Sequence, residues 1–504
     1  MPQMRGRGNT GWRRFIHRVA RITRTCLRGG AAPICPGHSA GAPRMTSSPV
    51  RNGDVSFWFA DLGGLPARRP PLPGDTRADV CIVGAGYTGL WAALYLKEQA
   101  PELDVLVVEK EFAGFGASGR NGGWLTGSFA WNHDRYLSTG TAEGVRAMVS
   151  AMSGTVDEVI RMAEAEGIDA DIHRTDELMV AVTPAQRARA EAEVRHRQAW
   201  GEERVSFLEA GALARRVRIP NAEGAMVVGG VARVQPAKLV RGLAAAAERR
   251  GVRIAEGTEV LGIAPGRVET RQGTVQAQVI LRATEGFTAT LPGLKREWLP
   301  LNSAQIVTEP LPPEVWDRIG WEGAEILGDM ANAYCYCQRT REGRIAVGAR
   351  GRAYRMASRI DARGEAEAVT VAHLLQRLKR HFPAAAGARI DHAWGGVLGV
   401  PRDWCATVGL DPATGIGWAG GYVGVGVSTS NLAGRTLADL ALGRDTALTR
   451  LPWVNRRVRR WEPEPLRWLG VRGMYRLLEA ADRQEEAGGP PSWLASLGHR
   501  LAGR

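Results

Sequence analysis

The fold of this chain is decided by residues 78–109, which read ADVCIVGAGYTGLWAALYLKEQAPELDVLVVE. The apolar run Ala78–Gly84 ends in glycine, as a buried parallel strand does. Tyr87–Lys97 carries apolar side chains at helical spacing, and Val105–Glu109 predicts a second buried strand. A strand, a glycine turn, a helix and a strand within about 30 residues form a βαβ unit.

The turn of this unit carries the G-x-G-x-x-G spacing of a dinucleotide site, at Gly84, Gly86 and Gly89. The first glycine allows the tight turn, the second lets the backbone approach a pyrophosphate, and the third lets helix and sheet pack closely. Glu109 ends the second strand and can accept hydrogen bonds from a ribose diol. An ordinary glycine turn in an α/β sheet is the plainer alternative, but the complete set favours a dinucleotide.

The next segment favours FAD over NAD. Residues 114–123 read GFGASGRNGG, with five glycines in ten residues, and such a segment can run close along an extended cofactor. Together with the turn, this run resembles the D-amino acid oxidase/glycine oxidase superfamily of FAD-dependent amine oxidoreductases. It most resembles the branch that contains gamma-glutamylputrescine oxidase. The resemblance extends from about residue 57 to about residue 445.

The resemblance implies further cofactor contacts along the chain. Val260 matches the backbone position that meets adenine, Ala283 and Thr284 end a strand near the pyrophosphate, and the glycine-rich turn 420–428 meets the flavin ring. A helix that begins there would direct its positive dipole end toward the flavin. The residues that we expect at FAD are Gly84, Ala85, Gly86, Tyr87, Thr88, Gly89, Glu109, Lys110, Gly116, Ala117, Ser118, Arg120, Asn121, Gly122, Gly123, Val260, Ala283, Thr284, Gly421, Gly424, Val425, Gly426 and Val427.

The expected fold is α/β, with a FAD-binding Rossmann-like domain and an interleaved, mostly antiparallel substrate domain. We expect residues 77–165, 234–295 and 397–445 to build the FAD-binding domain. We expect residues 166–233 and 296–396 to build the substrate domain. We expect the FAD-binding domain to have a largely parallel sheet, as βαβ units require.

Two positions bear on the cofactor linkage and the substrate. Gly396 stands where family members with covalent flavin have a cysteine, so we expect non-covalent FAD. Leu398 stands where many members that oxidise α-amino acids have an arginine that binds the carboxylate. This favours an amine without a free α-carboxylate, although Arg339, Arg350 or Arg402 can supply that contact from another strand. Tyr334, Tyr336 and Arg339, on a hairpin predicted over 334–349, are the candidate substrate contacts.

The resemblance implies oxidation of an amine C–N bond by hydride transfer to FAD, with oxygen as the acceptor. No side chain is required as a base in this chemistry, and we assign none. Two alternatives stay open. One is a dehydrogenase that passes electrons to a quinone or another carrier, and the other is a flavin-binding protein without turnover.

Composition narrows the class further. The 504 residues are 44% hydrophobic and 23% charged, which is typical of globular proteins. The net charge of +14 suggests nucleic acid, but residues 1–50 supply nine arginines and no acidic residue, and no basic motif interleaved with aromatics follows. No apolar run is long enough to span a membrane. Six cysteines are too few for a disulfide scaffold, so we expect a reducing, cytoplasmic location.

Three remaining segments lie outside this reasoning. Residues 1–50 are an extension, interpreted either as a basic transit peptide or, as we favour, as a start assigned upstream of Met45. Residues 446–504 are rich in arginine and tryptophan, and we expect them to be solvated or docked on the body rather than to bind a membrane or a partner subunit. Cys335 and Cys337 are too close in sequence for a zinc half-site, so we predict buried packing and no metal.

Overall fold

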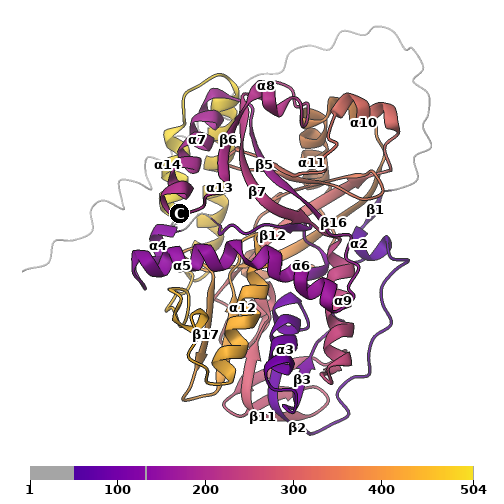
Figure 1. The fold of residues 1–504 in the computed structure, drawn as a ribbon, viewed down its shortest axis with the longest axis vertical. Helices are drawn as coiled ribbons and strands as arrows, with labels where there is room; N and C mark the ends of the chain where they lie inside the picture. The colour runs from indigo at the N-terminus through magenta and orange to yellow at the C-terminus, as the bar shows by residue number, and fades with distance from the viewer. Residues whose placement is uncertain (1–49, 131–132, 503–504) are drawn as a thin grey trace, which may run out of the picture. The chain divides into compact units, whose positions relative to one another are not determined.

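The computed structural model describes residues 50–130 and 133–502, and Pro49–Arg504 forms one compact unit. The predicted N-terminal extension, apart from Val50, lies outside the described residues. Two sheets organise this unit, with the parallel sheet in the lower half of Figure 1 and a larger, mostly antiparallel sheet in the upper half. Among the described residues, no helix is both long and apolar enough to cross a bilayer.

The parallel sheet contains the βαβ unit predicted from the sequence. Its central order is β18-β11-β2-β3-β8, in which all neighbours are parallel. An antiparallel strand, β17, covers one edge, and β9 and β10 extend β11 as an antiparallel hairpin. The strands are β2 (Thr76–Val83), β3 (Val105–Val108), β8 (Arg253–Ala255), β9 (Val260–Ala264), β10 (Arg267–Thr270), β11 (Thr274–Arg282), β17 (Thr407–Asp411) and β18 (Ile416–Gly420).

The larger sheet has the order β1-β16-β12-β15-β14-β13-β5-β7-β4, with β6 paired to β7. Its pairs are antiparallel except β1–β16 and β13–β5. The α/β fold class, with a Rossmann-like sheet and an interleaved, mostly antiparallel second sheet, is therefore confirmed. The strands are β1 (Arg51–Asn52), β4 (Trp124–Leu125), β5 (His173–Ala181), β6 (Val205–Glu209), β7 (Gly224–Arg233), β12 (Leu299–Thr308), β13 (Ile326–Asp329), β14 (Tyr336–Arg339), β15 (Ile345–Ala349) and β16 (Ile390–Val400).

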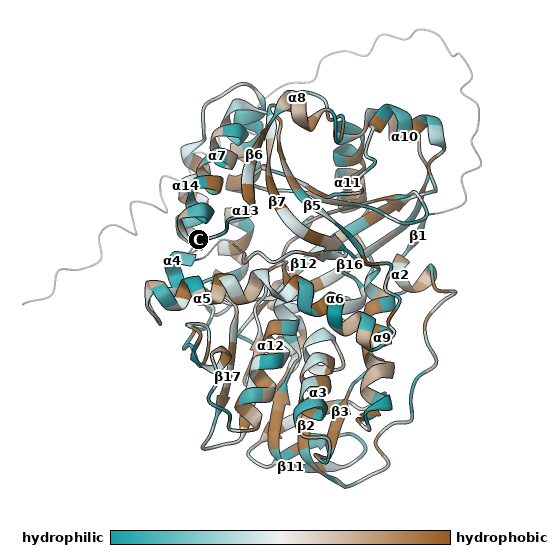
Figure 2. Ribbon diagram, in the orientation of Figure 1, coloured by the Kyte–Doolittle hydropathy of each residue, from teal (hydrophilic) through white to brown (hydrophobic). Residues whose placement is uncertain are grey.

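Helices cover the sheets and bury their apolar strands. Helix α3 packs against α9 and α12, and its residues from Tyr87 to Leu96 are all buried. Figure 2 shows the matching apolar strands β2, β3 and β11 beneath these helices. The helices are α2 (Phe57–Ala60), α3 (Tyr87–Gln99), α4 (His133–Tyr136), α5 (Ala142–Ser153), α6 (Thr155–Ala165), α7 (Pro184–Ala199), α8 (Ala210–Leu213), α9 (Pro236–Arg249), α10 (Pro313–Ile319), α11 (Ala368–His381), α12 (Gly426–Ala441), α13 (Leu466–Glu486) and α14 (Trp493–Ala502).

Two elements differ from the sequence expectation. Strand β14 begins at Tyr336, so Tyr334 lies in the turn before the strand and not on it. Strand β16 runs without a break through the expected domain boundary at residue 397, because Val397 to Val400 continue the pairing with β12. The chain leaves the larger sheet only after Val400, where Pro401 cannot extend the ladder of hydrogen bonds. The full set of domain boundaries stays a prediction.

The C-terminal segment docks on the body. The apolar face of α13 buries Val471, Met474 and Leu478 in one cluster with Leu299 and Trp404. Polar contacts continue this attachment. The Asp482 carboxylate accepts hydrogen bonds from the backbone N–H of Asn332 at 2.7 Å and of Ala333 at 2.8 Å, and from Asn332 Nδ2 at 2.9 Å. Of the two expected arrangements, solvated or docked on the body, the described residues of this segment show the docked one.

We expect Asp482→Ala to lower the free energy of unfolding by about 3 kcal/mol, because the backbone N–H groups of Asn332 and Ala333 lose their acceptor and Asn332 Nδ2 keeps only a longer contact to Glu485. Each unsatisfied group costs about 1–3 kcal/mol. A drop of several degrees in melting temperature, followed by circular dichroism, checks this. The exposed Glu479→Ala on the same helix is the matched control and should leave the melting temperature unchanged. Equal melting temperatures for the two variants would show that α13 does not stabilise the body.

Candidate active site

A long cavity lies at the carboxyl ends of the parallel strands, and it is built around the glycine turn between β2 and α3. Gly84 has a φ of +108°, and a Cβ there would lie 2.7 Å from the carbonyl oxygen of Ala283. A Cβ on Gly89 would lie 2.0 Å from the carbonyl oxygen of Gly84. Gly84 therefore permits the turn and Gly89 permits the contact between helix and strand, as the G-x-G-x-x-G spacing predicts.

Gly86 is the N-cap of α3 and lines the cavity. A Cβ there would come 3.0 Å from Ser118 Oγ, the atom that accepts a hydrogen bond from the backbone N–H of Tyr87 at 2.8 Å. The first turn of a helix has unpaired N–H groups and a positive dipole end, which together favour an anion. The space over Gly86 thus fits the close approach of a phosphate group.

The cavity holds about 1720 Å³ of space between its walls, part of it open to solvent, and it borders a second pocket. Most of the residues that we expected at FAD line this cavity. They are Gly84, Gly86, Tyr87, Thr88, Glu109, Lys110, Gly116, Ala117, Ser118, Asn121, Val260, Ala283, Thr284, Gly424, Gly426 and Val427. Arg120, Gly122 and Val425 instead line the second pocket, and Ala85, Gly89, Gly123 and Gly421 line neither.

Gly123, which lines neither cavity, and Arg120, which lines the second pocket, both support the walls. Gly123 has a φ of +69°, and a Cβ there would lie 2.1 Å from Gln338 Nε2. Arg120 is almost fully buried, and its guanidinium donates to the carbonyl oxygens of Phe115, Gly395 and Ala362 at 2.7–3.2 Å. Burial lowers the pKa of Arg120 to about 10. Its guanidinium thus fastens the glycine-rich segment to the larger sheet.

Glu109 occupies the position expected for ribose recognition. Its Oε2 accepts from the backbone N–H of Ala85 at 2.9 Å, and its Oε1 accepts from that of Glu111 at 2.9 Å. Burial raises the pKa of Glu109, while these two hydrogen bonds oppose the rise. The carboxylate therefore both lines the cavity and fixes the glycine turn.

The second glycine turn closes the far end of the cavity. Gly421 and Gly424 have φ values of +77° and +120°, and α12 begins at Gly426. Gly424 and Val427 line both the long cavity and the second pocket, as do Ala117, Asn121 and Leu398. The two cavities therefore meet at the N-terminus of α12, where its dipole favours negative charge.

Sequence reasoning missed Glu285, which organises this end. Its two carboxylate oxygens accept hydrogen bonds from the backbone N–H groups of Gly399 and Gly421, the latter at 3.1 Å. The carboxylate thus joins the end of β16 to the second glycine turn. Burial raises the pKa of Glu285 to about 7, and the backbone donors oppose the rise. Its place directly after the carboxyl end of β11, beside Thr284, was the available signal.

Tyrosines form one wall of the second pocket. Tyr334 and Tyr336 both line it, and Tyr336 Oη lies 3.0 Å from Ser303 Oγ. Arg339 does not reach the pocket, which differs from the expectation. It stands three residues after Tyr336, on the other face of β14, and its guanidinium lies 4.0 Å from the centre of the Trp316 ring.

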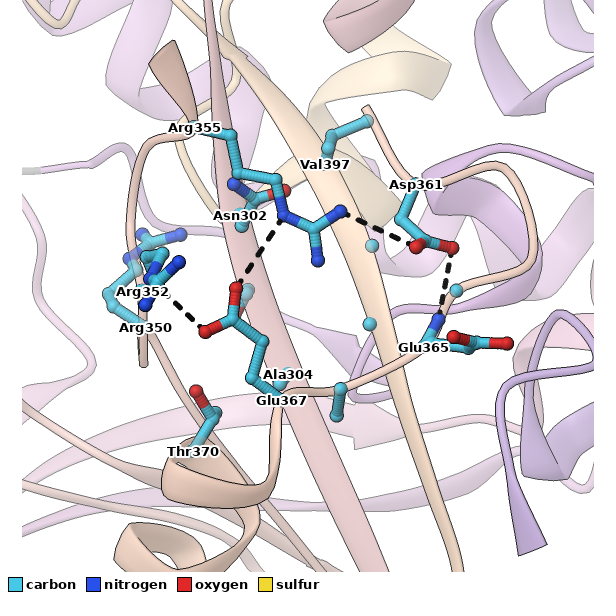
Figure 3. A pocket seen from close by; sticks show the side chains of 15 residues that line it. Asn302, Ala304, Arg350, Arg352, Arg355, Asp361, Glu365, Glu367, Thr370 and Val397 are labelled. Atoms are coloured by element: carbon cyan, nitrogen blue, oxygen red, sulfur yellow. Dashed lines mark hydrogen bonds and ion pairs between the residues drawn. The ribbon is translucent and has the colours of Figure 1, made fainter. Parts of the chain in front are cut away.

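Arg350 brings a positive charge into the second pocket. Its Nη2 donates to Tyr334 Oη at 3.3 Å, and within the described part of the chain no ion pair to a carboxylate accompanies this contact. The two arginines that follow it along the chain do have acidic partners. Arg352 lies 3.1 Å from Glu367, and Arg355 lies 3.4 Å from Asp361 (Figure 3). An arginine without an acidic partner in a pocket is suited to a carboxylate ligand.

Arg402, the third arginine considered from the sequence, pairs with Glu462 at 3.1 Å and lines neither cavity.

The acidic residue of the second pocket is Glu177 on β5, which sequence reasoning also missed. Glu177 is buried and accepts a hydrogen bond from Thr126 Oγ1 at 2.7 Å. Burial raises the pKa of Glu177, and Arg197 opposes the rise. A charged residue directly before the apolar run 178–182 was its signal in the sequence.

The residues present fit FAD. The glycine turn between β2 and α3 and the first turn of α3 suit the pyrophosphate. Glu109 suits the ribose, and the N-terminus of α12 suits an electron-rich ring. Gly396 lies beside Arg120 in the second pocket. Of the free cysteines in the described ranges, none lines either cavity. The arrangement defines a cavity of the Rossmann dinucleotide type that adjoins a second pocket at the N-terminus of α12.

Comparison with known proteins identifies the family to which this chain belongs. The chain belongs to the FAD dependent oxidoreductase family, whose sequence model matches residues 79–440. The "Probable oxidoreductase OrdL" of Rhizobium meliloti (strain 1021) is 30% identical over 417 residues, covering 80% of this chain and 91% of that protein. "Gamma-glutamylputrescine oxidoreductase" of Escherichia coli (strain K12) is 30% identical over 409 residues, covering 79% and 92%.

Solved structures agree on the fold. The glycine oxidase of Geobacillus kaustophilus superposes with a TM-score of 0.64 at 23% identity, covering 76% of this chain and 99% of that one. The L-proline dehydrogenase of P. horikoshii superposes with a TM-score of 0.61 at 17% identity, covering 76% and 96%. The protein is thus an FAD-dependent oxidoreductase of the amine and amino acid oxidase class.

Proposed function

We propose that the protein oxidises a C–N bond of an amine, with oxygen as the electron acceptor. The observation that carries this proposal is the meeting of the two cavities at Gly424 and Val427, beside the start of α12. When bound, FAD would supply the acceptor for a hydride lost from the carbon next to the substrate nitrogen, and oxygen would then take up these two electrons with two protons to become hydrogen peroxide. Water would hydrolyse the imine to a carbonyl compound and the remaining amine or ammonia.

The residues of the chain position the substrate and exclude water. Leu398 and Val423 offer apolar surface at the junction of the cavities, while Tyr334 and Tyr336 bound the pocket on the side of the larger sheet. The neutral amine is the form that can lose a hydride, so an apolar junction favours the reactive form. No residue is assigned as a base, because hydride loss from a neutral amine needs none.

We propose that the substrate carries a carboxylate held by Arg350. Leu398 stands where members that oxidise α-amino acids have the carboxylate-binding arginine, so this position offers no such contact here. Arg350, in the segment after β15, supplies the contact instead. Glu177 offers a second contact, to an ammonium group, in the same pocket. A substrate with both charges and an alkyl chain fits this pocket, and the relative named for gamma-glutamylputrescine supports that class.

A panel of amines tests the proposal. Glycine, sarcosine, D-amino acids, putrescine and gamma-glutamylputrescine are mixed anaerobically with the enzyme, and bleaching of the flavin absorption reports substrate oxidation whatever the acceptor. Bleaching by at least one amine, with peroxide formed in air, supports the oxidase. Bleaching without peroxide would instead indicate a dehydrogenase with a quinone or another carrier, and no bleaching by any amine would contradict amine oxidation.

We propose non-covalent FAD and expect acid precipitation to release it. Gly396 stands at the position of the covalent cysteine, and no cysteine of the described residues lines either cavity, which supports this proposal. Precipitated protein should be colourless and the supernatant yellow, with about one FAD per chain. Flavin absorption that stays with the protein pellet would contradict the proposal.

A cytoplasmic location is proposed as well, since Cys81, Cys335, Cys337 and Cys405 are buried and form no disulfide.

A further inference from the structure

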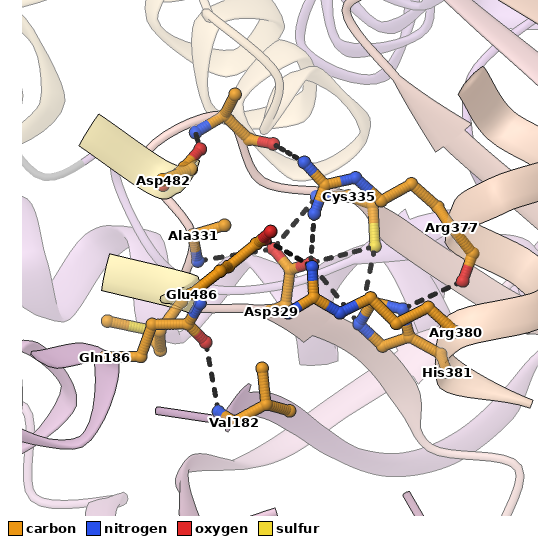
Figure 4. Close-up of polar contacts among 12 residues, drawn as sticks. Val182, Gln186, Asp329, Ala331, Cys335, Arg377, Arg380, His381, Asp482 and Glu486 are labelled. Atoms are coloured by element: carbon orange, nitrogen blue, oxygen red, sulfur yellow. Dashed lines mark hydrogen bonds and ion pairs between the residues drawn. The ribbon is translucent and has the colours of Figure 1, made fainter. Parts of the chain in front are cut away.

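Three potential metal ligands meet in the larger sheet, away from both cavities. Asp329 ends β13, Cys335 lies just before β14, and His381 is the last residue of α11. Figure 4 shows the three side chains converging. Asp329 Oδ2 lies 3.3 Å from Cys335 Sγ and 3.3 Å from His381 Nε2, and Sγ lies 3.9 Å from Nε2. All three residues are at most 2% exposed.

These distances match one face of a tetrahedral zinc site. Zinc binds thiolate sulfur at about 2.3 Å and imidazole nitrogen or carboxylate oxygen at about 2.0–2.2 Å, which places ligand atoms about 3.4–3.6 Å apart. Two of the observed separations are slightly shorter and one slightly longer, so small side-chain shifts suffice. Thiolate, imidazole and carboxylate together are a ligand set that zinc accepts.

The three facing atoms contact one another, and a metal would replace these mutual contacts while the outer hydrogen bonds hold the side chains in place. His381 Nδ1 lies 3.0 Å from the carbonyl oxygen of Arg377, and donation there leaves the lone pair of Nε2 directed at the cluster. Asp329 Oδ1 accepts from the backbone N–H of Cys335 at 3.1 Å, which leaves Oδ2 to face the other two ligands. Such outer contacts are typical of protein metal sites.

We propose that Asp329, Cys335 and His381 bind a zinc ion that stabilises the substrate side of the larger sheet. On binding, the Cys335 thiol releases its proton to solvent and its sulfur bonds to the metal. Arg377 Nη1 lies 3.5 Å from Asp329 Oδ2 and stays as an outer partner of the carboxylate. With three protein ligands, the fourth position of the metal is left for water.

The site ties a functional loop to a helix. Residues 330–335 connect β13 to β14 and include Tyr334 of the substrate pocket, while His381 anchors them to α11. Asp482 of α13 holds the same loop from the other side through Asn332. Cys335 and Cys337 thus do not form a half-site by themselves. The remaining ligands come from residues that the fold brings together. This inference does not depend on the proposed reaction.

The test is the metal content of the full-length holoenzyme, purified without metal-affinity steps from cells grown with added zinc. We expect about one zinc per chain by plasma mass spectrometry. Cys335→Ser, Asp329→Asn and His381→Gln should each lose most of it, at least about tenfold, with FAD content as the folding control. The matched control, Cys405→Ser, removes another buried cysteine and should keep the zinc.

A second measurement covers the case in which the variants fold poorly. Wild-type protein is stripped with a chelator and titrated with cobalt(II), which should give a tetrahedral absorption band at longer wavelength than the flavin. A zinc content below about a tenth per chain in the wild type, with no cobalt band, would overturn the proposal. That result would identify the cluster as an ion pair of protonated His381 with Asp329. Equal zinc in the wild type and in the folded variants would overturn it as well.

Discussion

Gly86→Val should yield a folded protein that retains no FAD. The isopropyl group would project into the space over the first turn of α3, where a phosphate has to approach the backbone. Its Cβ alone would come 3.0 Å from Ser118 Oγ and disturb the hydrogen bond to the Tyr87 N–H. Since φ at Gly86 is −84°, a side chain is tolerated by the backbone itself. Flavin absorbance per chain should fall at least about tenfold, with circular dichroism unchanged.

The matched control is Gly387→Val. Nothing lies within 4 Å of a Cβ built at Gly387, which is remote from both cavities. This variant should keep full flavin content, so the comparison separates a general cost of valine from loss of the phosphate space. Normal FAD content in Gly86→Val would mean that the phosphates lie elsewhere and would remove the main support for the cofactor assignment.

Arg350→Leu should lower kcat/KM for a carboxylate-bearing amine by about two orders of magnitude. Hydrogen bonds between an arginine and a carboxylate are worth about 1.5–3 kcal/mol each, and a bidentate pair provides two of them. Because Arg350 lies in the pocket and Leu398 offers no such contact, leucine at 350 would leave the substrate charge unpaired. Arg350→Lys should recover part of the rate, since lysine keeps the charge without the fork.

The control for this variant is Arg352→Leu, two residues along, whose side chain is 58% exposed and pairs with Glu367. It should leave kcat/KM within about twofold, because exposed ion pairs contribute little. Oxidation of putrescine, which has no carboxylate, should be insensitive to Arg350→Leu. Equal rates of wild type and Arg350→Leu on every carboxylate-bearing amine would contradict the assignment of Arg350, whereas flavin bleaching by those amines would still support amine oxidation.

Local patterns accounted for the cofactor side of the site. Gly84, Gly86 and Gly89 stand at fixed spacing within one βαβ unit, so the spacing is sufficient to predict the turn, although the atoms that Gly84 and Gly86 approach belong to Ala283 and Ser118. The glycine turn before α12 followed from the same kind of signal. These features depend on neighbours in sequence, and the structure brings them together at the carboxyl edge of the parallel strands.

Contacts between distant strands were harder to predict. Arg339 lies on β14 and Arg350 directly follows β15, the next strand of the same hairpin. Which of them faces the pocket depends on strand parity and on where the two strands begin and end. Glu285 looked like an ordinary residue after a strand, because its partners Gly399 and Gly421 are more than a hundred positions away. The Asp329, Cys335 and His381 cluster was missed for the same reason, since its third ligand comes from a helix 46 positions beyond Cys335.

The order of the strands also has a consequence for biosynthesis. The wall that closes the flavin end of the cavity is made by Gly424, Gly426 and Val427, and β18, which precedes them, pairs with β11 of the parallel sheet. While these residues are still inside the ribosome, the glycine cradle at residue 84 faces an incomplete cavity. At about 5–20 residues per second, synthesis leaves that cradle exposed for tens of seconds. Cofactor capture is therefore a late event in the making of this protein, and its supply has to be available after most of the chain has emerged.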